Sequence, residues 1–323
     1  MKRKKDLFDK MVSDENILQA YLAARLGKKH YREVAAIDAD INHRLGELKE
    51  LLLSGSFRTS EYTTIEKMSG SKLREIKKLP FFPDRIVHHC IVQVMRETWI
   101  NLLIRDTFST IPGRGIHDGA NRVKLALRDK ENTRYCLKLD IRKYYPSVDN
   151  RMLKEVIRRK IKDERFLAVI DEIIDSSPGI PIGNYVSQWF GNLYLAYFDH
   201  YVKEQLKCRY YFRYCDDLVL LSASKEELRG WLAQIRQYLK SELNLEIKSN
   251  YQIFPVEKRG IDFLGYRFFP GFTLVRKRIV KEMKRKLASP KSMASYWGWL
   301  KHADSYRLTL KYFGHERKFK QTA

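Results

Sequence analysis

Two adjacent aspartates between two apolar, β-forming runs restrict the fold of this chain most strongly. Asp216 and Asp217 separate Tyr210-Tyr-Phe212 from Leu218-Val-Leu-Leu221. Carboxylates are not buried unpaired inside a strand, so they belong at the turn of a β-hairpin, where they stay hydrated or bind a cation. Adjacent acids repel each other, and a divalent cation would relieve that repulsion. An ordinary hairpin turn explains Tyr214-Cys-Asp-Asp217 about equally well when these four residues are taken alone.

A second acidic position lies at the end of another expected strand. Segment 135–141 alternates apolar and polar side chains, which places Asp140 on the face opposite Leu139 and Ile141. A solitary acid at a strand end is more often structural. Two strand-borne acidic sites together are typical of two-metal phosphoryl transfer, because Mg²⁺ prefers carboxylate and phosphate oxygens. One ion would lower the pKa of a primer 3′-hydroxyl, and the other would hold the triphosphate and the leaving group.

The charge of the chain indicates the class of its partner. The 323 residues include 62 Lys or Arg and 39 Asp or Glu, which gives a net charge of +23. Such a charge opposes compaction unless a polyanion binds, so nucleic acid is the leading partner class. With 44% hydrophobic residues, the composition is that of a globular protein. A basic surface that merely keeps the protein soluble is the alternative.

Several other classes are disfavoured. The basic start is not followed by the apolar core of a signal peptide, and no apolar run approaches the roughly 20 residues that span a bilayer. The four cysteines show neither CxxC spacing nor paired histidines, which argues against a zinc site and a disulfide framework. We therefore expect a reducing, cytoplasmic setting and no membrane partner.

Hydrophobic periodicity and turn residues predict a mixed α+β fold. Ser13 is expected to cap the first helix, and Asp149 or Asn150 to cap the helix that follows them. Pro- and Gly-rich loops are expected at 111–119 and 178–183. The expected helices are 13–26, 38–53, 84–104, 120–129, 151–174, 187–206 and 225–241, and the expected extended segments are 57–79, 135–141, the hairpin 209–222, 245–254 and 261–268.

Four blocks in chain order resemble those of reverse transcriptases, and the last resembles a primer grip. They are Arg85-Ile-Val-His-His89, Lys138-Leu-Asp-Ile-Arg-Lys-Tyr-Tyr-Pro-Ser-Val-Asp149, Tyr214-Cys-Asp-Asp217 and Phe263-Leu-Gly-Tyr266. The resemblance implies a right-hand polymerase with an antiparallel palm sheet and a helical, basic thumb. It implies an N-terminal helical extension at 1–56, fingers at 57–134, a palm at 135–270 with a fingers-like insert at about 150–185, and a thumb at 271–323.

The resemblance also assigns the chemistry of the acidic site. It implies that Asp140 and Asp216 are metal ligands together with Ile141, and that Asp217 completes the catalytic carboxylates. Two Mg²⁺ ions are the implied cofactors, and deoxynucleoside triphosphates are the implied substrates. Template RNA and the RNA–DNA duplex are the implied nucleic-acid partners.

Further residues resemble the nucleotide- and nucleic-acid-binding positions of the family. The ring of Tyr145 would stack under the incoming sugar and exclude a 2′-hydroxyl, although core packing is its alternative. Lys72 and Arg74 share one face of an expected strand and would hold the triphosphate, although a solvated basic strand is their alternative. Lys248 would protonate pyrophosphate. The implied nucleic-acid contacts are Phe263, Leu264, Gly265 and Tyr266 in the primer grip, and Arg276, Lys277, Arg278, Lys284 and Arg285 in the thumb.

One block departs from the commoner bacterial pattern. Most bacterial reverse transcriptases carry QGxxxSP where this chain has Ile182-Gly-Asn-Tyr-Val-Ser-Gln188. The variant resembles reverse transcriptases of diversity-generating retroelements, which copy a template RNA with errors opposite adenines and work with a small basic accessory protein. Ile182 can only pack where Gln would hydrogen-bond, so we expect weaker discrimination by the nucleotide-binding block that includes Gly183 and Gln188. A neutral packing substitution is the alternative.

Other interpretations stay open beside the diversity-generating one. The nearest is a group II intron-like, retron or phage-defence reverse transcriptase, which would also be cytoplasmic and encoded by a bacterium or phage. A nucleic-acid-binding protein that has lost catalysis is disfavoured, because all three aspartates are present. A basic structural protein would leave the ordered blocks unexplained.

Overall fold

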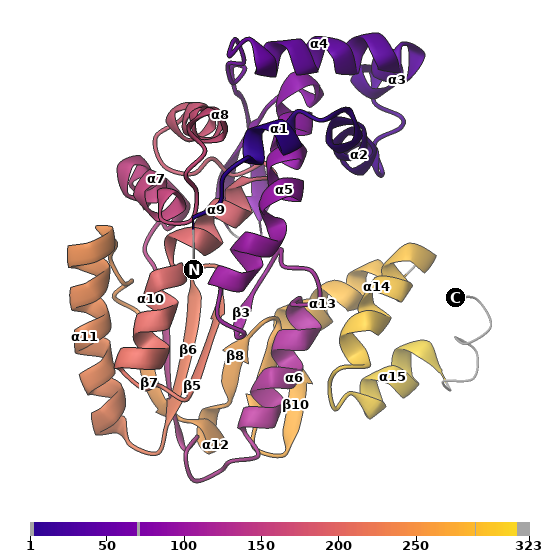
Figure 1. The fold of residues 1–323 in the computed structure, drawn as a ribbon. Coiled ribbons are helices and arrows are strands. Elements are labelled where there is room, and N and C mark those ends of the chain that lie inside the picture. Colours follow the sequence, from indigo (N-terminus) through magenta and orange to yellow (C-terminus); the bar gives the residue numbers. More distant parts are fainter. Residues whose placement is uncertain (1–2, 70–71, 288, 315–323) are drawn as a thin grey trace. The chain divides into compact units, whose positions relative to one another are not determined.

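The computed structural model describes residues 3–69, 72–287 and 289–314. The chain folds into two compact units, each assembled from three stretches of sequence (Figure 1). Unit 1 comprises Met1–Ile104, Arg142–His200 and Tyr238–Glu246, and unit 2 comprises Arg105–Ile141, Tyr201–Gln237 and Ile247–Ala323. Within the described residues, no helix combines the length and the apolar character needed to cross a membrane.

Unit 1 is largely helical, with one β-hairpin. The antiparallel hairpin pairs β1 (Thr63–Ser69) with β2 (Lys72–Lys78), as the extended segment 57–79 predicts; Gly70 and Ser71 of its expected turn lie outside the described residues. The Ser13 side chain accepts a hydrogen bond from Asn16 N and caps α2, as predicted. The helices are α1 (Leu7–Met11), α2 (Asp14–Arg25), α3 (Arg32–Ala39), α4 (Ile41–Leu53), the π-helix η1 (Phe81–Arg85), α5 (Ile86–Leu102), the 3₁₀ helix η2 (Tyr145–Ser147), α7 (Asn150–Arg158), α8 (Glu164–Asp175), α9 (Ser187–Tyr194) and α10 (Ala196–His200).

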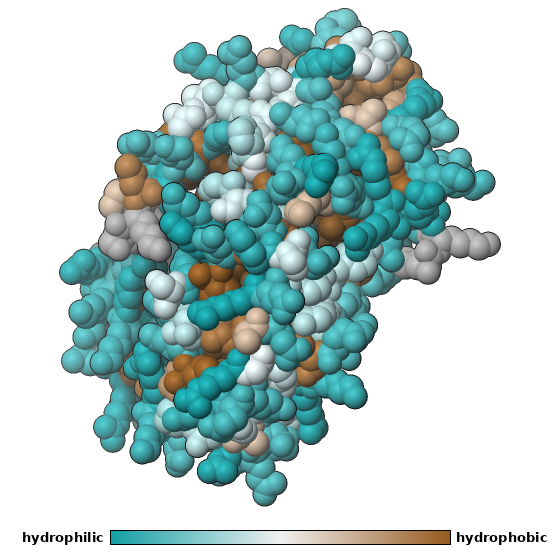
Figure 2. All heavy atoms as spheres, turned by 90° about the vertical axis from the view of Figure 1, so that its left-hand side faces the viewer, coloured by the Kyte–Doolittle hydropathy of each residue, from teal (hydrophilic) through white to brown (hydrophobic). Residues whose placement is uncertain are grey.

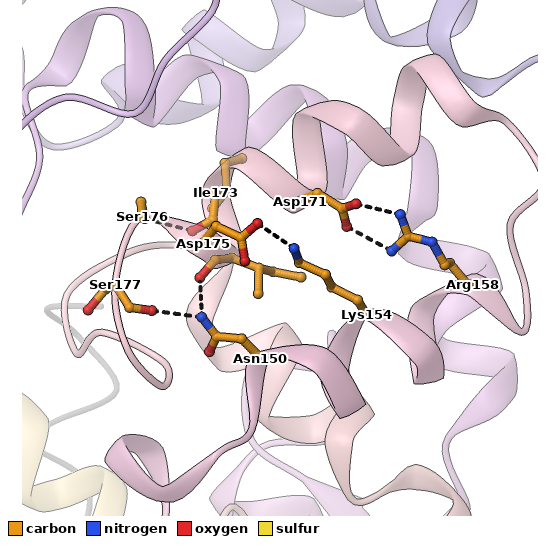
Figure 3. Close-up of polar contacts among 9 residues, drawn as sticks. Asn150, Lys154, Arg158, Asp171, Ile173, Asp175, Ser176 and Ser177 are labelled. Atoms are coloured by element: carbon orange, nitrogen blue, oxygen red, sulfur yellow. Dashed lines mark hydrogen bonds and ion pairs between the residues drawn. The ribbon is translucent and has the colours of Figure 1, made fainter.

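Two predicted helices of this unit are broken in the structure. The helix expected at 38–53 begins only at Ile41, and the separate helix α3 precedes it. The helix expected at 151–174 is divided into α7 and α8, because Asp163 accepts a hydrogen bond from Phe166 N and starts a new helix. The two pieces remain joined by side chains: Lys154 and Arg158 of α7 pair with Asp175 and Asp171 of α8 (Figure 3).

Unit 2 contains both sheets of the α+β core. The five-stranded sheet has the order β3-β5-β6-β4-β7, and all its pairs are antiparallel except that of the short β3 with β5. The second sheet has the order β10-β9-β8 and is antiparallel throughout. The strands are β3 (Thr107–Phe108), β4 (Tyr135–Asp140), β5 (Tyr210–Tyr214), β6 (Asp217–Ser222), β7 (Gln252–Pro255), β8 (Ile261–Phe263), β9 (Tyr266–Phe269) and β10 (Phe272–Val275).

The helices of unit 2 close over a shared apolar core. Buried side chains from both sheets and from the C-terminal helices form one cluster that includes Phe212, Phe254, Phe268 and Phe313. In the described residues that follow β10, the basic C-terminal region forms three helices, as expected. The helices are α6 (Ile116–Ala126), the π-helix η3 (Tyr201–Gln205), α11 (Lys225–Leu243), most of which belongs to this unit, α12 (Val256–Arg259), α13 (Lys277–Lys286), α14 (Pro290–Leu300) and α15 (Tyr306–Phe313).

Three further boundaries differ from the sequence-based expectation. Helix α6 begins at Ile116 inside the expected glycine-rich loop; Gly119 lies within it, where a Cβ would come 2.5 Å from Leu264 Cδ1. That glycine therefore allows close packing in a helix and does not mark a loop. The helix expected at 187–206 is divided into α9, α10 and η3. In the segment expected to be extended at 245–254, strand β7 covers only the last residues, and Ile247 makes an isolated bridge with Ile141.

One face of the molecule is mainly hydrophilic (Figure 2). On the face that Figure 2 displays, hydrophilic side chains predominate and hydrophobic ones are confined to small patches. Large hydrophobic side chains that are well exposed are scattered over both units, for example Leu26 and Met68 in unit 1 and Tyr306 in unit 2. Such a surface suits the net charge of +23.

Candidate active site

The sheet of unit 2 brings the three sequence-predicted carboxylates together. Asp140, the last residue of β4, is the cross-strand partner of Asp217, the first residue of β6. Directly opposed residues of antiparallel strands have Cβ atoms about 4.5–5.5 Å apart. Asp216 lies in the turn between β5 and β6, and its carbonyl accepts a hydrogen bond from Ile141 N at 3.1 Å. Residues about 77 positions apart in the chain thus share one end of the sheet.

The turn that carries Asp216 contains one residue in the left-handed conformation, whose carbonyl accepts a hydrogen bond from a buried arginine. Cys215 has φ of +53°, a region that non-glycine residues seldom adopt. Arg213, which is fully buried on β5, donates from Nη1 to the Cys215 carbonyl at 3.1 Å. The backbone N of Arg213 also donates to Asp106 O. Arg213 was not among the residues expected from the sequence, because only its burial distinguishes it from the other basic residues of this chain.

Two lysines supply positive charge to the carboxylates. Lys138 Nζ lies 2.5 Å from Asp217 Oδ1, and Lys248 Nζ lies 3.6 Å from Asp140 Oδ2. Lys248 N also donates to Asp140 O at 2.9 Å, which fixes this lysine beside the strand end. The structure therefore brings the predicted Lys248 into the acidic site. It adds Lys138, which the alternation of β4 could have indicated because residues 138 and 140 share a face.

The surroundings of Asp217 disfavour its charged form. The pKa of Asp217 is raised to about 6, because burial and the neighbouring carboxylates of Asp140 and Asp216 together outweigh the opposing effect of Lys138. The charged carboxylate is thus disfavoured unless a cation is close. Asp217 keeps 26% and Asp140 34% of its side chain exposed, so ions can reach both.

The donor set suits a hard divalent cation. Carboxylate and carbonyl oxygens are the ligands that Mg²⁺ prefers, and Asp140, Asp216, Asp217 and the Ile141 carbonyl offer only these. In the part of the chain that the structure describes, no three His, Cys, Asp or Glu side chains are grouped as a metal cluster. The Lys138 ammonium, which is bonded to Asp217, adds local positive charge to this donor set.

The predicted fingers residues lie on the hairpin of unit 1. Lys72 and Arg74 belong to β2, two residues apart, and the Arg74 side chain is exposed. The neighbouring Lys77 is a structural residue, because its Nζ donates to Ser177 Oγ at 2.7 Å and lies over the Tyr62 ring. The hairpin is thereby fastened to the loop at 176–184.

The block 182–188, which departs from the commoner bacterial pattern, begins in this loop and ends on α9. Lys77 N donates to Ile182 O at 2.8 Å, so Ile182 is held directly against β2. Gly183 has φ of +134°, and a Cβ there would come 2.2 Å from Lys77 O. Ile182 is half-buried, whereas Gln188 is exposed on α9. The close backbone approach explains the glycine of the block.

The two tyrosines after β4 have different surroundings. Tyr144 is buried and its hydroxyl donates to Gly191 O, so it is the core aromatic. Tyr145 is half-buried, and its carbonyl accepts from Ile180 N at 2.8 Å. Both rings lie close to Gly191. Tyr145, Lys72, Arg74, Ile182, Gly183 and Gln188 belong to unit 1, while the carboxylates and Lys248 belong to unit 2.

The primer-grip residues expected to contact nucleic acid are buried. Phe263 and Tyr266 have no exposed surface and Leu264 keeps 7%. A Cβ on Gly265, which has φ of +82°, would come 2.4 Å from Trp299 Cζ3 of α14. These four residues therefore pack the β8–β9 turn against the C-terminal helices, and their side chains are not available at the surface. The sequence pattern identified the block but not its burial.

The predicted thumb residues are mostly exposed. Arg276 is the exception, because it pairs with Asp262 through Nη2 at 2.5 Å. Arg278 makes a longer pair with Glu282 on the same helix. The side chains that α13 exposes include Lys277, Arg278, Lys284 and Arg285.

Comparison with known families decides among the classes of protein. The family model described as "Reverse transcriptase (RNA-dependent DNA polymerase)" matches residues 65–268, which is more than half of the chain. The chain belongs to the reverse transcriptase family. Members of this family are RNA-dependent DNA polymerases that generally use Mg²⁺ and deoxynucleoside triphosphates.

Two curated relatives share moderate sequence similarity with this reverse transcriptase. Protein YkfC of Escherichia coli strain K12 is 27% identical over 278 residues, covering 72% of this chain and 71% of that protein. The COX1/OXI3 intron 2 protein of Saccharomyces cerevisiae is 20% identical over 246 residues, covering 54% of this chain and 29% of that protein.

Solved structures confirm the fold class. Telomerase from Candida albicans with a TWJ fragment of telomeric RNA matches with a TM-score of 0.53 and 12% identity, over 75% of this chain and 54% of that chain. Telomerase from Candida tropicalis with a TWJ fragment matches with a TM-score of 0.54 and 13% identity, over 85% and 59%. The expected right-hand polymerase fold is thus confirmed, although the chain spans little more than half of either telomerase chain.

Proposed function

We propose that this chain catalyses RNA-templated DNA synthesis at Asp140, Asp216 and Asp217. The observation that carries the proposal is the cross-strand pairing of Asp140 with Asp217 beside the Asp216 turn, in a member of the reverse transcriptase family. Asp140 and Asp216, with the Ile141 carbonyl, would hold Mg²⁺, and Asp217 would complete the negative site. Bound Mg²⁺ would supply charge stabilisation for the triphosphate and activation of the primer 3′-hydroxyl.

Primer extension tests this proposal directly. With an RNA template, a DNA primer, Mg²⁺ and deoxynucleoside triphosphates, the wild-type chain should extend the primer. Asp216→Ala should lower the rate by at least a hundredfold, because it removes a cation ligand. Asp149→Ala is the matched control: Asp149 accepts from Met152 N and caps α7, so its loss should lower stability and leave the acidic site intact. Equal activity of wild type and Asp216→Ala would contradict the proposal.

The other protein residues expected to bind the incoming nucleotide are given the following proposed roles. We assign Arg74 and Lys72 on β2 to the triphosphate, the half-buried Tyr145 to exclusion of a 2′-hydroxyl, and Lys248 to proton donation to pyrophosphate. The proposed regions are an extension at 1–56, fingers at 57–134, a palm at 135–270 and a thumb at 271–323. The exposed lysines and arginines of α13 would follow the phosphates of an RNA–DNA duplex.

A finer proposal concerns fidelity. We infer that Ile182 makes synthesis error-prone opposite adenines, as in diversity-generating retroelements. Its carbonyl bond to Lys77 N holds it against β2, and its apolar side chain offers no hydrogen bond to test a base pair. Ile182→Gln should therefore lower misincorporation opposite adenine severalfold in a sequencing-based fidelity assay, while Ile182→Val should not. Unchanged adenine errors in Ile182→Gln would remove this support.

An intron-type enzyme is the second candidate. The similarity to a yeast protein named for a COX1/OXI3 intron favours it, although only 29% of that protein is covered. The two candidates predict different templates and partners. A diversity-generating enzyme would act on a structured template RNA with a small basic accessory protein, whereas an intron-type enzyme would bind its own intron RNA. The error spectrum of the wild-type protein distinguishes the two candidates. Frequent errors confined to template adenines are expected only of a diversity-generating enzyme.

A further inference from the structure

Lys138 is held at the acidic site by two contacts. Its Nζ hydrogen-bonds Asp217 Oδ1 at 2.5 Å and lies 5.4 Å from the centre of the Phe263 ring. Only 21% of the Lys138 side chain is exposed, and Phe263 is fully buried. A carboxylate and an aromatic face therefore hold this ammonium together, and a cation over a ring is most strongly attracted where water is excluded.

The strand register shows that Lys138 reaches along the sheet to make this contact. The residue directly opposite Lys138 is Val219, whereas Asp217 is opposite Asp140. Lys138 and Asp217 are thus diagonal neighbours, which only a long side chain can connect. The contact places positive charge on Asp217, whose carboxylate faces that of Asp140 on the adjacent strand.

Lys248 does not duplicate this arrangement. Its Nζ lies at the longer distance of 3.6 Å from Asp140, and its side chain is 31% exposed. In the part of the chain that the structure describes, the ring contacts of lysines near the carboxylates involve Lys138 alone. Phe263 belongs to the block expected to contact nucleic acid, and this contact gives its buried ring a different task.

We propose that Lys138, supported by Phe263, is an internal counter-cation that holds Asp217 in the metal-free protein and competes with divalent cations for it. The proposal rests on the proposed function, which places those cations at the same carboxylates. A positive charge within about 4 Å of a carboxylate opposes the approach of a second cation, and removal of that charge should strengthen cation binding. Lys138 is accordingly a positioning residue.

Binding of Mn²⁺ to the full chain without nucleic acid tests the proposal. Electron paramagnetic resonance reports free Mn²⁺, so affinity is measured without activity. Lys138→Met and Lys138→Gln should each bind Mn²⁺ at least threefold more tightly than wild type, and Lys138→Arg should resemble wild type. Without metal, the midpoint of thermal unfolding should fall in both neutral variants, and Mg²⁺ should raise it by more than in wild type.

The matched control is Lys225→Met. Lys225 Nζ also lies over an aromatic ring, at 5.3 Å from the centre of the Tyr135 ring in β4. Tyr135 is five positions before Asp140 along the strand, so this contact lies away from the carboxylates. Its substitution should leave Mn²⁺ affinity unchanged. Unchanged or weaker Mn²⁺ binding in both neutral Lys138 variants would overturn the role of Lys138 while the proposed function survives, provided that Asp216→Ala weakens binding. If Asp216→Ala binds Mn²⁺ as wild type does, both proposals fail.

Discussion

At the scale of single residues, backbone geometry explains more of this protein than residue type does. Cys215 holds a left-handed conformation in the turn beside Asp216, and the buried Arg213 supports its carbonyl. Gly183 has a backbone conformation that side chains rarely allow, directly against β2. Both positions lie in blocks that the sequence marked as functional. Their spacing was visible in the sequence, but the reason for each residue was not.

Gly183→Ala tests the close approach of the 176–184 loop to β2. The added Cβ would lie 2.2 Å from Lys77 O, so the bond from Lys77 N to Ile182 O cannot be kept unchanged. We expect a loss of about 1–3 kcal/mol in the free energy of unfolding and reduced primer extension. Urea denaturation measures the first quantity and a polymerase assay the second.

Gly230→Ala provides the control for that measurement. Gly230 lies in α11, where a Cβ would meet nothing within 4 Å. Alanine should there stabilise the helix by up to about 1 kcal/mol. If Gly183→Ala unfolds at the same urea concentration as wild type, the contact is not as tight as the structure indicates.

Residue types also explain which parts of the site the sequence could predict. The pair Asp140 and Asp217 followed from acids at the ends of two apolar strands, and Lys248 followed from the family block. Burial of Phe263 and Tyr266 did not, because it depends on tertiary packing, for example of the Tyr266 ring beside Trp299 of α14. The spacing of residues in a motif does not show which of their side chains are buried in the core.

At the scale of elements, caps decide where helices begin and end. Asp163 divides the expected helix at 151–174, because its Oδ1 accepts from Phe166 N. Its Oδ2 accepts from Leu7 N at 2.6 Å and from Phe8 N at 2.8 Å. The Asp163 carboxylate therefore accepts backbone hydrogen bonds at the start of both α8 and α1. The bonds to α1 join residues about 155 positions apart, so the sequence around Asp163 could not predict them.

Helix α5 carries a buried histidine that makes stability depend on pH. His88 is 2% exposed, and its Nε2 has no hydrogen-bond partner. Burial above all, together with the positive charge of the neighbouring His89 and Arg85, lowers the pKa of His88 to about 3. The folded protein therefore keeps His88 neutral, whereas the unfolded chain protonates it below about pH 6.5.

The sign of that dependence follows from proton uptake. Between about pH 6.5 and 3 the unfolded state binds the extra proton, so stability falls as pH falls. From pH 7.5 to 5.5, wild type should lose about 1.4 kcal/mol more unfolding free energy than His88→Phe. Denaturation at the two pH values measures this, with the exposed His30→Gln as a control that should behave as wild type. Equal pH dependence in wild type and His88→Phe would show that His88 does not titrate differently on folding.

At the scale of the whole molecule, charge and family membership agree. The net charge of +23 makes nucleic acid the leading partner class, and the reverse transcriptase family model covers residues 65–268. The mixed α+β class was predictable from the change of hydrophobic period along the chain. The membership of the two units was not, because each unit is assembled from three separate stretches of the chain.

Binding of an RNA–DNA duplex should depend steeply on salt. Each phosphate that a lysine or arginine neutralises adds about −0.7 to −0.9 to the slope of log affinity against log salt. We expect affinity to fall at least tenfold between 50 and 200 mM salt in a fluorescence anisotropy titration. Replacing Lys284 and Arg285 of α13 by alanine should make the slope shallower by about 1–2. A flat response in wild type would exclude phosphate contacts as the main source of affinity.

Asp140, Asp216 and Asp217 are proposed to form one cation site for nucleotide transfer. Anomalous diffraction from crystals grown with Mn²⁺, a primer on an RNA template and a non-reactive nucleotide would locate that cation. We expect a Mn²⁺ peak bound by carboxylate oxygens of both Asp140 and Asp216. Manganese bound elsewhere, with these two carboxylates free of metal, would contradict the proposal.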